Sequence, residues 1–266
     1  MYATNYHRPT SIADAVKLLK ANDEAKLLAG GQTLIPTLKQ RLARPSDLVD
    51  LGGLKELSYI KVEGGKVTIG ALTRHADVAA SDAVKRAIPA LAHLAGEIGD
   101  PAVRNRGTIG GSLANSDPAA DYPAAVLGLG ATITTNKRKI EADKFFMGLY
   151  ETALEPGELI TQVTFPAPKR AAYMKFKNPA SRFALVGVFV ADFGGGNVRV
   201  GVTGAGASAF RQGDMEKALS QKFAPESVAG IKVKPDGLNN DLHASPEYRA
   251  HLIAVMCKRA VEAALK

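Results

Sequence analysis

Two glycine pairs carry the clearest chemical signal in this sequence. Gly30 and Gly31 stand in AGGQT, Gly110 and Gly111 stand in TIGGS, and each pair has a hydroxyl residue close by. Because glycine lacks a Cβ, backbone amides there can approach a ligand closely, and a concave run of amides binds phosphate. Two such loops could hold one pyrophosphate from both sides, as a dinucleotide requires. Each loop taken alone is better explained as an ordinary tight turn, since most glycine pairs bind nothing.

Other nucleotide-binding and nucleophile motifs are misplaced or absent. GLGAT at 128–132 offers two glycines, but a predicted helix precedes it and a predicted strand follows, which reverses the order of the dinucleotide fingerprint. GVTGAG at 201–206 lacks a following helix. Neither GxxxxGK[ST] nor GxSxG occurs.

The redox and metal-binding residue types are too few for a catalytic centre. Cys257 is the only cysteine, whereas a disulfide needs two thiols and an iron–sulfur cluster held by cysteines needs four. The histidines are scattered, without metal-ligand spacing, and are interpreted as surface residues: His7, His75, His93, His243 and His251. We therefore expect any iron–sulfur cluster and any substrate-activating metal to lie on another chain.

The first glycine pair is predicted to join a strand to a helix. A short apolar strand over residues 25–29 breaks at Gly30, and apolar residues then recur at helical spacing at Ile35, Leu38 and Leu42. An amphipathic helix precedes this unit and begins with a capping box from Ser11 to Asp14.

The second glycine pair lies in a turn, RNRGTIGGSLAN, between predicted helices. Before it, YIKVEGGKVTIGALT predicts a hairpin turning at Gly64 and Gly65, and residues 75–95 read as helical with a break at Pro89. After it, a helix is predicted to end at Gly128 or Gly130, followed by two strands around a polar turn at 136–139.

Proline and charge concentrate in FPAPKR, residues 165–170, where we place the main domain boundary. Beyond it, two strand-like stretches are joined by glycines 194–196, and residues 215–219 and 247–265 look helical. The final part is therefore predicted to be a small sheet covered by helices, within an α+β protein.

Composition indicates a folded protein of more than one sub-domain. The chain has 266 residues, of which 46% are hydrophobic and 23% are charged. Its net charge of +8 would suit nucleic acid, an anionic membrane or a phosphate-bearing ligand. The densest basic run, Lys137 to Lys139, has no aromatic platform beside it and is interpreted as a solvated turn. We expect no nucleic acid partner, no membrane span and a cytoplasmic location.

A longer pattern combines these elements. AGGQT, then RNRGTIGGSLANSDPAADYPAAVLGLGA, then FFMGLYETALEPGELI, resembles the FAD-binding medium subunit of the molybdenum hydroxylases, in particular the carbon monoxide dehydrogenase type, related to the flavin domain of xanthine dehydrogenase. DLHASPEYRAHLIAVMCKRAVEAAL resembles that family's closing domain. The resemblance covers nearly the whole chain, and the run at 104–130 is its most specific part.

The resemblance implies a fold and a set of FAD-binding residues. The fold is a two-part FAD-binding domain of the vanillyl-alcohol-oxidase/PCMH type, residues 1–55 and 56–168, plus a C-terminal α/β domain of the CO dehydrogenase flavoprotein type, residues 169–266. The first FAD-contacting loop would be Ala29, Gly30, Gly31, Gln32, Thr33 and Leu34. The second would be Thr108, Ile109, Gly110, Gly111, Ser112 and Asn115. Relatives often have asparagine or aspartate where Ser112 stands.

The resemblance also implies roles for single residues outside the two loops. Asp121 matches an acidic residue that hydrogen-bonds FAD hydroxyls, although Asp121 or Asp117 could instead cap a helix, and we favour Asp117 as the cap. Leu159 or Ile160 and Lys177 match positions that touch the isoalloxazine ring, where a cation would stabilise reduced flavin. Phe183 could pack on the flavin ring or could be an ordinary phenylalanine of the hydrophobic core. Arg104 and Arg106 could face a phosphate or a partner subunit, or could simply be solvated, and we leave them outside the predicted site.

The resemblance also implies partners. FAD would be bound non-covalently, with the molybdenum cofactor on a large subunit and [2Fe-2S] clusters on a small subunit, as a dimer of heterotrimers. The chain would pass electrons from the clusters through FAD to an external acceptor. Two alternatives stay open, a self-contained FAD-dependent oxidase and a non-catalytic nucleotide-binding scaffold.

Overall fold

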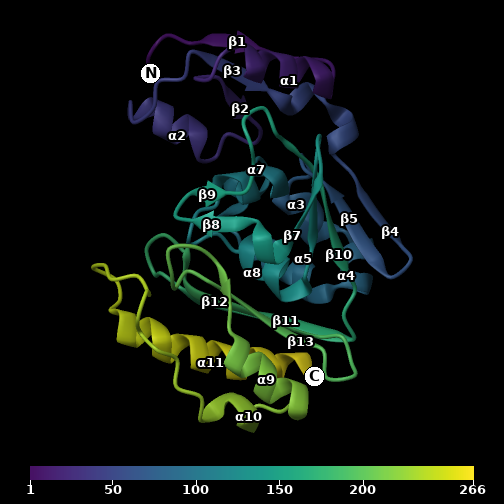
Figure 1. Ribbon diagram of the computed structural model, residues 1–266, viewed down its shortest axis with the longest axis vertical. Coiled ribbons are helices and arrows are strands. Elements are labelled where there is room, and N and C mark those ends of the chain that lie inside the picture. Colours follow the sequence, from purple (N-terminus) through teal and green to yellow (C-terminus); the bar gives the residue numbers. More distant parts are fainter.

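The sheets follow one another from one end of the molecule to the other (Figure 1). The computed structural model describes residues 1–266. It contains a three-stranded, a five-stranded and a four-stranded sheet, and a small hairpin of two strands. Strands and helices mix along the chain, so the predicted α+β class is confirmed.

The N-terminal part is a parallel sheet of order β1-β3-β2 with two helices. Its elements are β1 Asn5–His7, α1 Ile12–Ala21, β2 Lys26–Leu28, α2 Leu34–Lys39 and β3 Asp47–Asp50. The capping box is confirmed, because the Ser11 hydroxyl accepts the N–H of Asp14 at 3.1 Å. The prediction for Leu42 was wrong: α2 ends at Lys39, Arg41 adopts a left-handed φ of 59°, and Leu42 is exposed.

The middle part is an antiparallel sheet of order β4-β5-β10-β6-β7 with helices packed against it. Its strands are β4 Ile60–Glu63, β5 Lys66–Gly70, β6 Thr132–Thr135, β7 Lys139–Glu141 and β10 Ile160–Pro166, with the hairpin β8 Phe146–Gly148 and β9 Glu151–Thr152. Its helices are α3 His75–Ala80, α4 Asp82–Ala87, α5 Pro89–Gly96, α6 Pro101–Arg104, α7 Ile109–Asn115 and α8 Tyr122–Leu129. The predicted hairpin at Gly64 and Gly65 and the helix end at Gly130 are confirmed.

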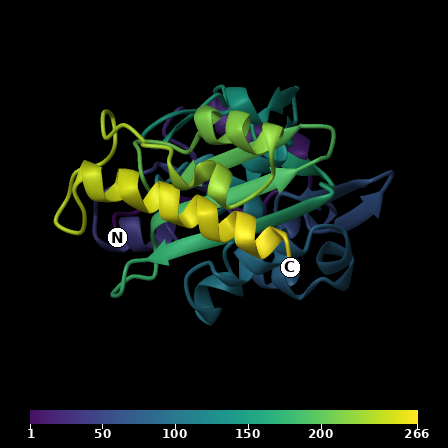
Figure 2. The ribbon, with the colours of Figure 1, turned by 90° about the horizontal axis from the view of Figure 1, so that it is seen from below.

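The C-terminal part is the predicted sheet covered by helices. Its elements are β11 Arg170–Lys177, β12 Ala184–Asp192, β13 Val198–Thr203, β14 Phe210–Arg211, α9 Gly213–Gln221, α10 Glu226–Ala229 and α11 Pro246–Ala264. The long helix α11 crosses one face of this sheet (Figure 2). None of the helices in the structure combines the length and apolar character needed to cross a lipid bilayer.

The C-terminal sheet also packs against the middle part. All residues of β12 are buried, because α11 covers one face and α8 the other. A Cβ on Gly201 of β13 would lie 2.2 Å from the carbonyl oxygen of Ala124 in α8, so glycine permits this close approach. The main core cluster accordingly includes Tyr173 and Phe189 of the C-terminal sheet.

Candidate functional site

The loop between β2 and α2 presents backbone amides that have no partner in the chain. The N–H groups from Gly30 to Leu34 donate no hydrogen bond to any protein atom. Gly31 has a φ of 73°, which only glycine adopts readily, and the Thr33 hydroxyl forms no cap bond with α2. Backbone N–H groups require acceptors, so this loop has several free donors available for an anion.

The two glycine loops are in direct contact, although many residues separate them in the sequence. A Cβ on Gly30 would lie 2.2 Å from the carbonyl oxygen of Arg106 and 2.8 Å from Cα of Gly107. A Cβ on Gly111 would lie 3.7 Å from Cβ of Ala29. The tertiary structure therefore brings the predicted loops together at one place.

The second loop differs from the sequence-based prediction in two respects. Residues Ile109–Asn115, predicted to belong to a turn, form helix α7, and the backbone amides of the loop are used differently. The N–H of Ile109 donates to the carbonyl of Thr73 at 3.1 Å, and that of Gly110 donates to the carbonyl of Ala71 at 2.9 Å. The Thr108 hydroxyl caps α7 by accepting the N–H of Gly111 at 3.2 Å. These amides are consumed by the fold, so the idea that both loops offer free amides to a pyrophosphate is corrected: only the first does.

The role expected of Gly110 also changes. Gly110 is buried, and a Cβ there would lie 2.6 Å from Cβ of Ala71 and 2.8 Å from its carbonyl oxygen. Glycine at this position lets α7 pack against the segment after β5. Its absent side chain makes room for protein backbone and not for a ligand.

The outer face of α7 carries free polar groups. Ser112 and Asn115 are partly exposed, and neither side chain forms a hydrogen bond within the chain. The helix starts beside the first loop and ends at Ser116, which has a left-handed φ of 46°. It thus leads from the free amides towards Asp117, where a cavity begins.

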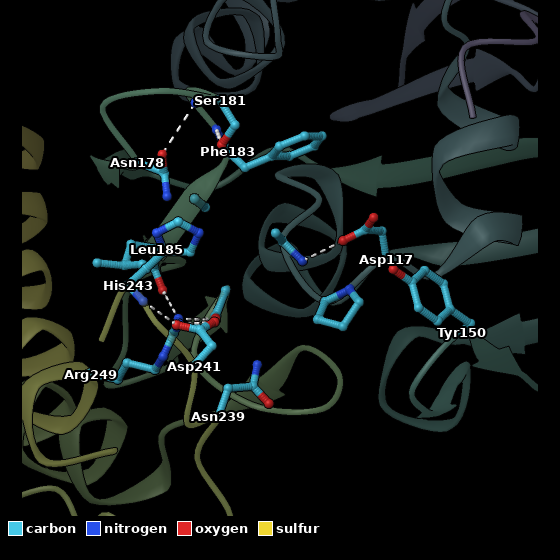
Figure 3. Close-up of a pocket in the computed structure, with 14 residues that line it drawn as sticks. Asp117, Tyr150, Asn178, Ser181, Phe183, Leu185, Asn239, Asp241, His243 and Arg249 are labelled. Carbon is cyan, nitrogen blue, oxygen red and sulfur yellow. Dashed lines mark hydrogen bonds and ion pairs between the residues drawn. The ribbon is translucent and has the colours of Figure 1, made fainter. Parts of the chain in front are cut away.

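A cavity of about 280 Å³ lies between the middle and C-terminal parts (Figure 3). Asp117, Pro118 and Ala119 form one wall, and the half-exposed ring of Phe183 extends from the opposite segment towards Asp117. The cavity is also lined by Tyr150, Asn178, Ser181, Ala184, Leu185, Gly204, Asn239, Asp241, His243 and Arg249. Of the residues predicted from sequence, only Phe183 lines it.

Asp121 lies in a buried polar cluster. Its carboxylate contacts the Lys175 ammonium at 2.9 Å and accepts the Tyr173 hydroxyl at 2.5 Å. Burial raises the pKa of Asp121 above its ordinary value, while the Lys175 ammonium opposes the rise. Asp121 caps no helix. The preference for Asp117 as a helix cap is also corrected, because its carboxylate accepts the N–H of Ala119 in a turn at 2.8 Å.

The residues predicted to touch the flavin ring at the start of β10, Leu159 just before the strand and Ile160 as its first residue, are core residues. Leu159 and Ile160 are 1% and 5% exposed and pack in two hydrophobic clusters. The backbone N–H of Leu159 also donates to the Asn136 side chain at 2.8 Å. The structure therefore gives no support to a ring contact through these side chains, because both are enclosed by the fold.

Lys177 is half-exposed and paired. Its ammonium lies 2.5 Å from the carboxylate of Glu97. Burial alone would raise the pKa of Glu97, but the ion pair with Lys177 lowers it below its ordinary value. A cation is therefore available at this position, and its contact with a ring stays a prediction.

The arginines that flank the second loop differ in their surroundings. Arg104 donates to the carbonyl oxygens of Ile98 and Gly99 at 3.0 and 3.3 Å, and so ties down the segment that follows α5. Arg106 is exposed and forms no hydrogen bond or ion pair within the chain. Of these two arginines, only Arg106 keeps a guanidinium without a partner in the chain, and its backbone carbonyl lies against Gly30 of the first loop.

Sequence reasoning missed Tyr150, Lys175 and Arg249. Arg249 is buried and donates to the carbonyls of Leu185 and Gly204 at 2.8 and 2.9 Å. No local motif marks these residues, because their partners lie on distant segments. Of the three, only Tyr150 stands out in the folded chain, because its φ of 55° is unusual for a residue other than glycine.

Comparison with known proteins decides the family. A family model described as the FAD binding domain in molybdopterin dehydrogenase matches residues 2–168. The chain belongs to this FAD-binding family. The FAD-binding subunit is 36% identical over 270 residues to the glyceraldehyde dehydrogenase medium chain of Sulfolobus acidocaldarius, with 96% of each chain covered. It is 36% identical over 277 residues to the carbon monoxide dehydrogenase medium chain of Hydrogenophaga pseudoflava, covering 97% of this chain and 96% of that one.

A solved structure agrees with these relatives. The FAD-binding subunit matches a chain of reconstituted CO dehydrogenase from Oligotropha carboxidovorans with a TM-score of 0.91 and 35% identity, covering 99% of this chain and 98% of that one. The prediction of an FAD-binding medium subunit of a molybdenum-containing oxidoreductase is confirmed. These relatives are chains of dehydrogenases and hydroxylases, which goes against a non-catalytic scaffold.

The residues present fit FAD. The free amides from Gly30 to Leu34 match an anionic pyrophosphate, and the polar outer face of α7 leads from them towards the cavity. The cavity has an exposed aromatic ring at Phe183 and polar groups on both walls. An extended dinucleotide needs such a succession of an anion site, hydroxyl partners and a ring site.

Proposed function

We propose that the chain binds one FAD non-covalently and passes electrons from the [2Fe-2S] clusters of a small subunit to an external acceptor. The observation that carries the proposal is the loop from Gly30 to Leu34, whose amides are free and which packs against the second glycine loop. When bound, FAD supplies the redox chemistry, since it takes up electrons and releases them.

The residues of the chain have separate tasks in this proposal. The Gly30–Leu34 amides bind the pyrophosphate, and the Thr33 hydroxyl lies beside it. Ser112 and Asn115 hydrogen-bond FAD hydroxyls from the outer face of α7. Phe183 packs on the isoalloxazine ring at the cavity and limits the access of water to it. Lys177 supplies a positive charge that favours the reduced, anionic ring.

Electron relay is favoured over a self-contained oxidase by the relatives, which are medium chains of dehydrogenases, and the chain offers no metal-based oxidation centre of its own. Cys257 is buried, and burial raises the pKa of its thiol to about 12, so it is a poor metal ligand or nucleophile. No group of three histidine, cysteine or acidic side chains in the structure is placed to hold a metal ion. We therefore assign substrate oxidation to a large molybdenum-cofactor subunit.

The assembly and the domain division are part of the same proposal. The relatives are called medium chains, which supports a complex with a large and a small subunit, proposed here as a dimer of heterotrimers. The proposed division is two FAD-binding parts of PCMH type, 1–55 and 56–168, and a C-terminal domain, 169–266. The end of the family match at residue 168 supports that last boundary. A cytoplasmic location stays a prediction.

The first test is reconstitution of the purified chain with FAD. We expect one FAD per chain, an oxidised-flavin spectrum and release of free FAD by heat or acid. A flavin that stays attached to the denatured chain would contradict non-covalent binding, and equally tight binding of FMN would contradict a pyrophosphate site.

The second test separates relay from direct oxidation. The chain, expressed with its neighbouring coding regions, is mixed anaerobically with glyceraldehyde, carbon monoxide or nicotine, the compounds in the names of its relatives. A compound that bleaches the flavin of the complex should leave the flavin of the isolated chain oxidised. Equally rapid bleaching of the isolated chain would favour the self-contained oxidase.

A further inference from the structure

The C-terminal sheet holds the turn that forms one wall of the cavity. The Thr203 hydroxyl lies 3.0 Å from the carbonyl oxygen of Pro118 and 2.6 Å from that of Ala120. The N–H of Gly204 donates to the same Pro118 carbonyl at 2.7 Å. The turn from 117 to 121 therefore takes its position from β13, a strand far away in the sequence.

A buried ion pair fixes the end of the same turn. The Lys175 ammonium on β11 lies 2.9 and 3.0 Å from the two carboxylate oxygens of Asp121, and it donates to the carbonyl of Glu97 at 3.0 Å. The side chains of Lys175 and Asp121 are only 2% and 3% exposed. Tyr173, two residues earlier on the same strand, donates its hydroxyl to Asp121. One ammonium thus joins β11, the end of α5 and the turn.

The geometry of this cluster explains why it acts on the cavity. Asp117, Pro118 and Ala119 line the cavity directly, whereas Asp121 lies behind them and has its carboxylate occupied by Lys175 and Tyr173. Removing the ammonium would leave a buried carboxylate uncompensated, which strongly destabilises the arrangement around it. The turn would relieve that by moving towards solvent, and the cavity wall would move with it.

We propose that Lys175, acting through Asp121, is a positioning residue that fixes the 117–121 turn in the geometry the flavin ring requires. This inference rests on the proposed FAD site. Lys175 touches no part of the cavity itself, so its effect on FAD passes through the turn. Thr203 holds the same turn through hydrogen-bonding contacts that involve no charged group.

The test uses the full chain, with FAD affinity measured by fluorescence titration of the apoprotein and stability measured by urea unfolding. Lys175→Met should weaken FAD binding roughly 10-fold or more, as when an outer partner that orients a binding group is lost. Thr203→Val should weaken it in the same direction. Arg170→Met is the matched control, because Arg170 lies on the same strand as Lys175 and its 2.8 Å ion pair with Asp192 of β12 lies outside the cavity.

A double variant separates position from stability. In Asp121→Asn with Lys175→Met, the buried pair is neutral, so the free energy of unfolding should recover towards that of the wild type. FAD affinity should stay low, because the neutral pair does not hold the turn. Full recovery of affinity in the double variant, or unchanged affinity in both Lys175→Met and Thr203→Val, would overturn the inference. If the wild-type chain binds no FAD, the proposed function fails and this inference falls with it.

Discussion

Glycine at the two loops permits contact between backbones that a side chain would separate. At Gly30 the contact is with Arg106 and Gly107 of the other loop, and at Gly110 it is with Ala71 inside the fold. The first contact brings together two surfaces that face a ligand, and the second supports the helix behind them. The same residue type therefore serves binding at one position and packing at the other.

Gly30→Ala should weaken FAD binding roughly 10-fold or more, because the added Cβ would lie 2.2 Å from the Arg106 carbonyl and push the loops apart. Fluorescence titration of the apoprotein with FAD measures the effect. Gly213→Ala is the control, since neither glycine has a left-handed φ and nothing lies near the new Cβ at Gly213. Equal FAD affinity in both variants would show that contact between the loops is not needed.

His75 supports the second loop through a backbone hydrogen bond. His75 is buried, so its interpretation as a surface residue was wrong. Its backbone N–H donates to the Gly107 carbonyl at 3.0 Å, and its ring packs against Tyr122 with centroids 5.4 Å apart. Burial, together with the smaller effect of the nearby Arg104 guanidinium, lowers the pKa of His75 to about 4. The imidazole is therefore neutral in the folded protein over the physiological range.

Acid should destabilise the chain through His75. The pKa of His75 is about 4 in the folded protein and about 6.5 when unfolded, so between these values the unfolded state binds more protons. Stability is then full above about pH 6.5 and falls by up to about 3 kcal/mol as the pH drops towards 4. Urea unfolding measures this slope, which His75→Gln should flatten. The exposed His93→Gln should leave it unchanged, and identical slopes in all three proteins would refute the assignment.

At the scale of the element, α7 presents two faces with different tasks. Ile109, Gly110 and Leu113 are buried on the inner face, where they pack on the middle sheet. Ser112 and Asn115 lie on the outer face with free polar groups. The helix is capped by Thr108 and held by Ala71, so its position does not depend on a ligand.

Substitutions on the two faces of α7 should separate stability from binding. Gly110→Val should lower the free energy of unfolding of the apoprotein by roughly 1–3 kcal/mol, because it overpacks against Ala71. Asn115→Ala should leave that free energy within about 0.5 kcal/mol and weaken FAD by the roughly 1 kcal/mol of a lost hydrogen bond. Urea unfolding and FAD titration of both variants provide the check. Unchanged FAD affinity in Asn115→Ala would remove Asn115 from the site.

At the scale of the whole molecule, the C-terminal sheet completes the core of the middle part. Helix α8 is buried along its length between the two, and β12 is buried on both faces. Asp143 of the middle part also pairs with Arg199 and Arg211 of the C-terminal sheet at 2.5 and 3.1 Å. The boundary proposed at residue 168 therefore crosses a shared interior.

A fragment of residues 1–168 should not fold as a stable unit. Removing the sheet exposes the apolar face of α8 and leaves Asp121 without Lys175, so we expect aggregation or a loosely packed state. Dye binding, near-UV circular dichroism and urea unfolding of the fragment test this expectation. A soluble fragment with a cooperative transition and tight FAD binding would show that the C-terminal part is an independent domain.

The sequence by itself determined the local features and the family. The capping box at Ser11, the hairpin turn at Gly64 and Gly65 and the helix end at Gly130 depend on side chains and dihedral preferences within a few residues, so they can be identified without the fold. The long run at 104–130 likewise identified the FAD-binding family, because it is specific over many positions.

Only the tertiary structure decided which groups of the candidate site are free. The amides of Gly30 to Leu34 stay unpaired, whereas that of Gly110 is taken by Ala71, and the glycine pairs look alike in the sequence. Asp121 received a buried partner, Lys175, from a strand more than fifty residues later. Hydrogen-bond satisfaction and burial depend on partners that the chain brings close only when it folds, so neither can be deduced from local sequence.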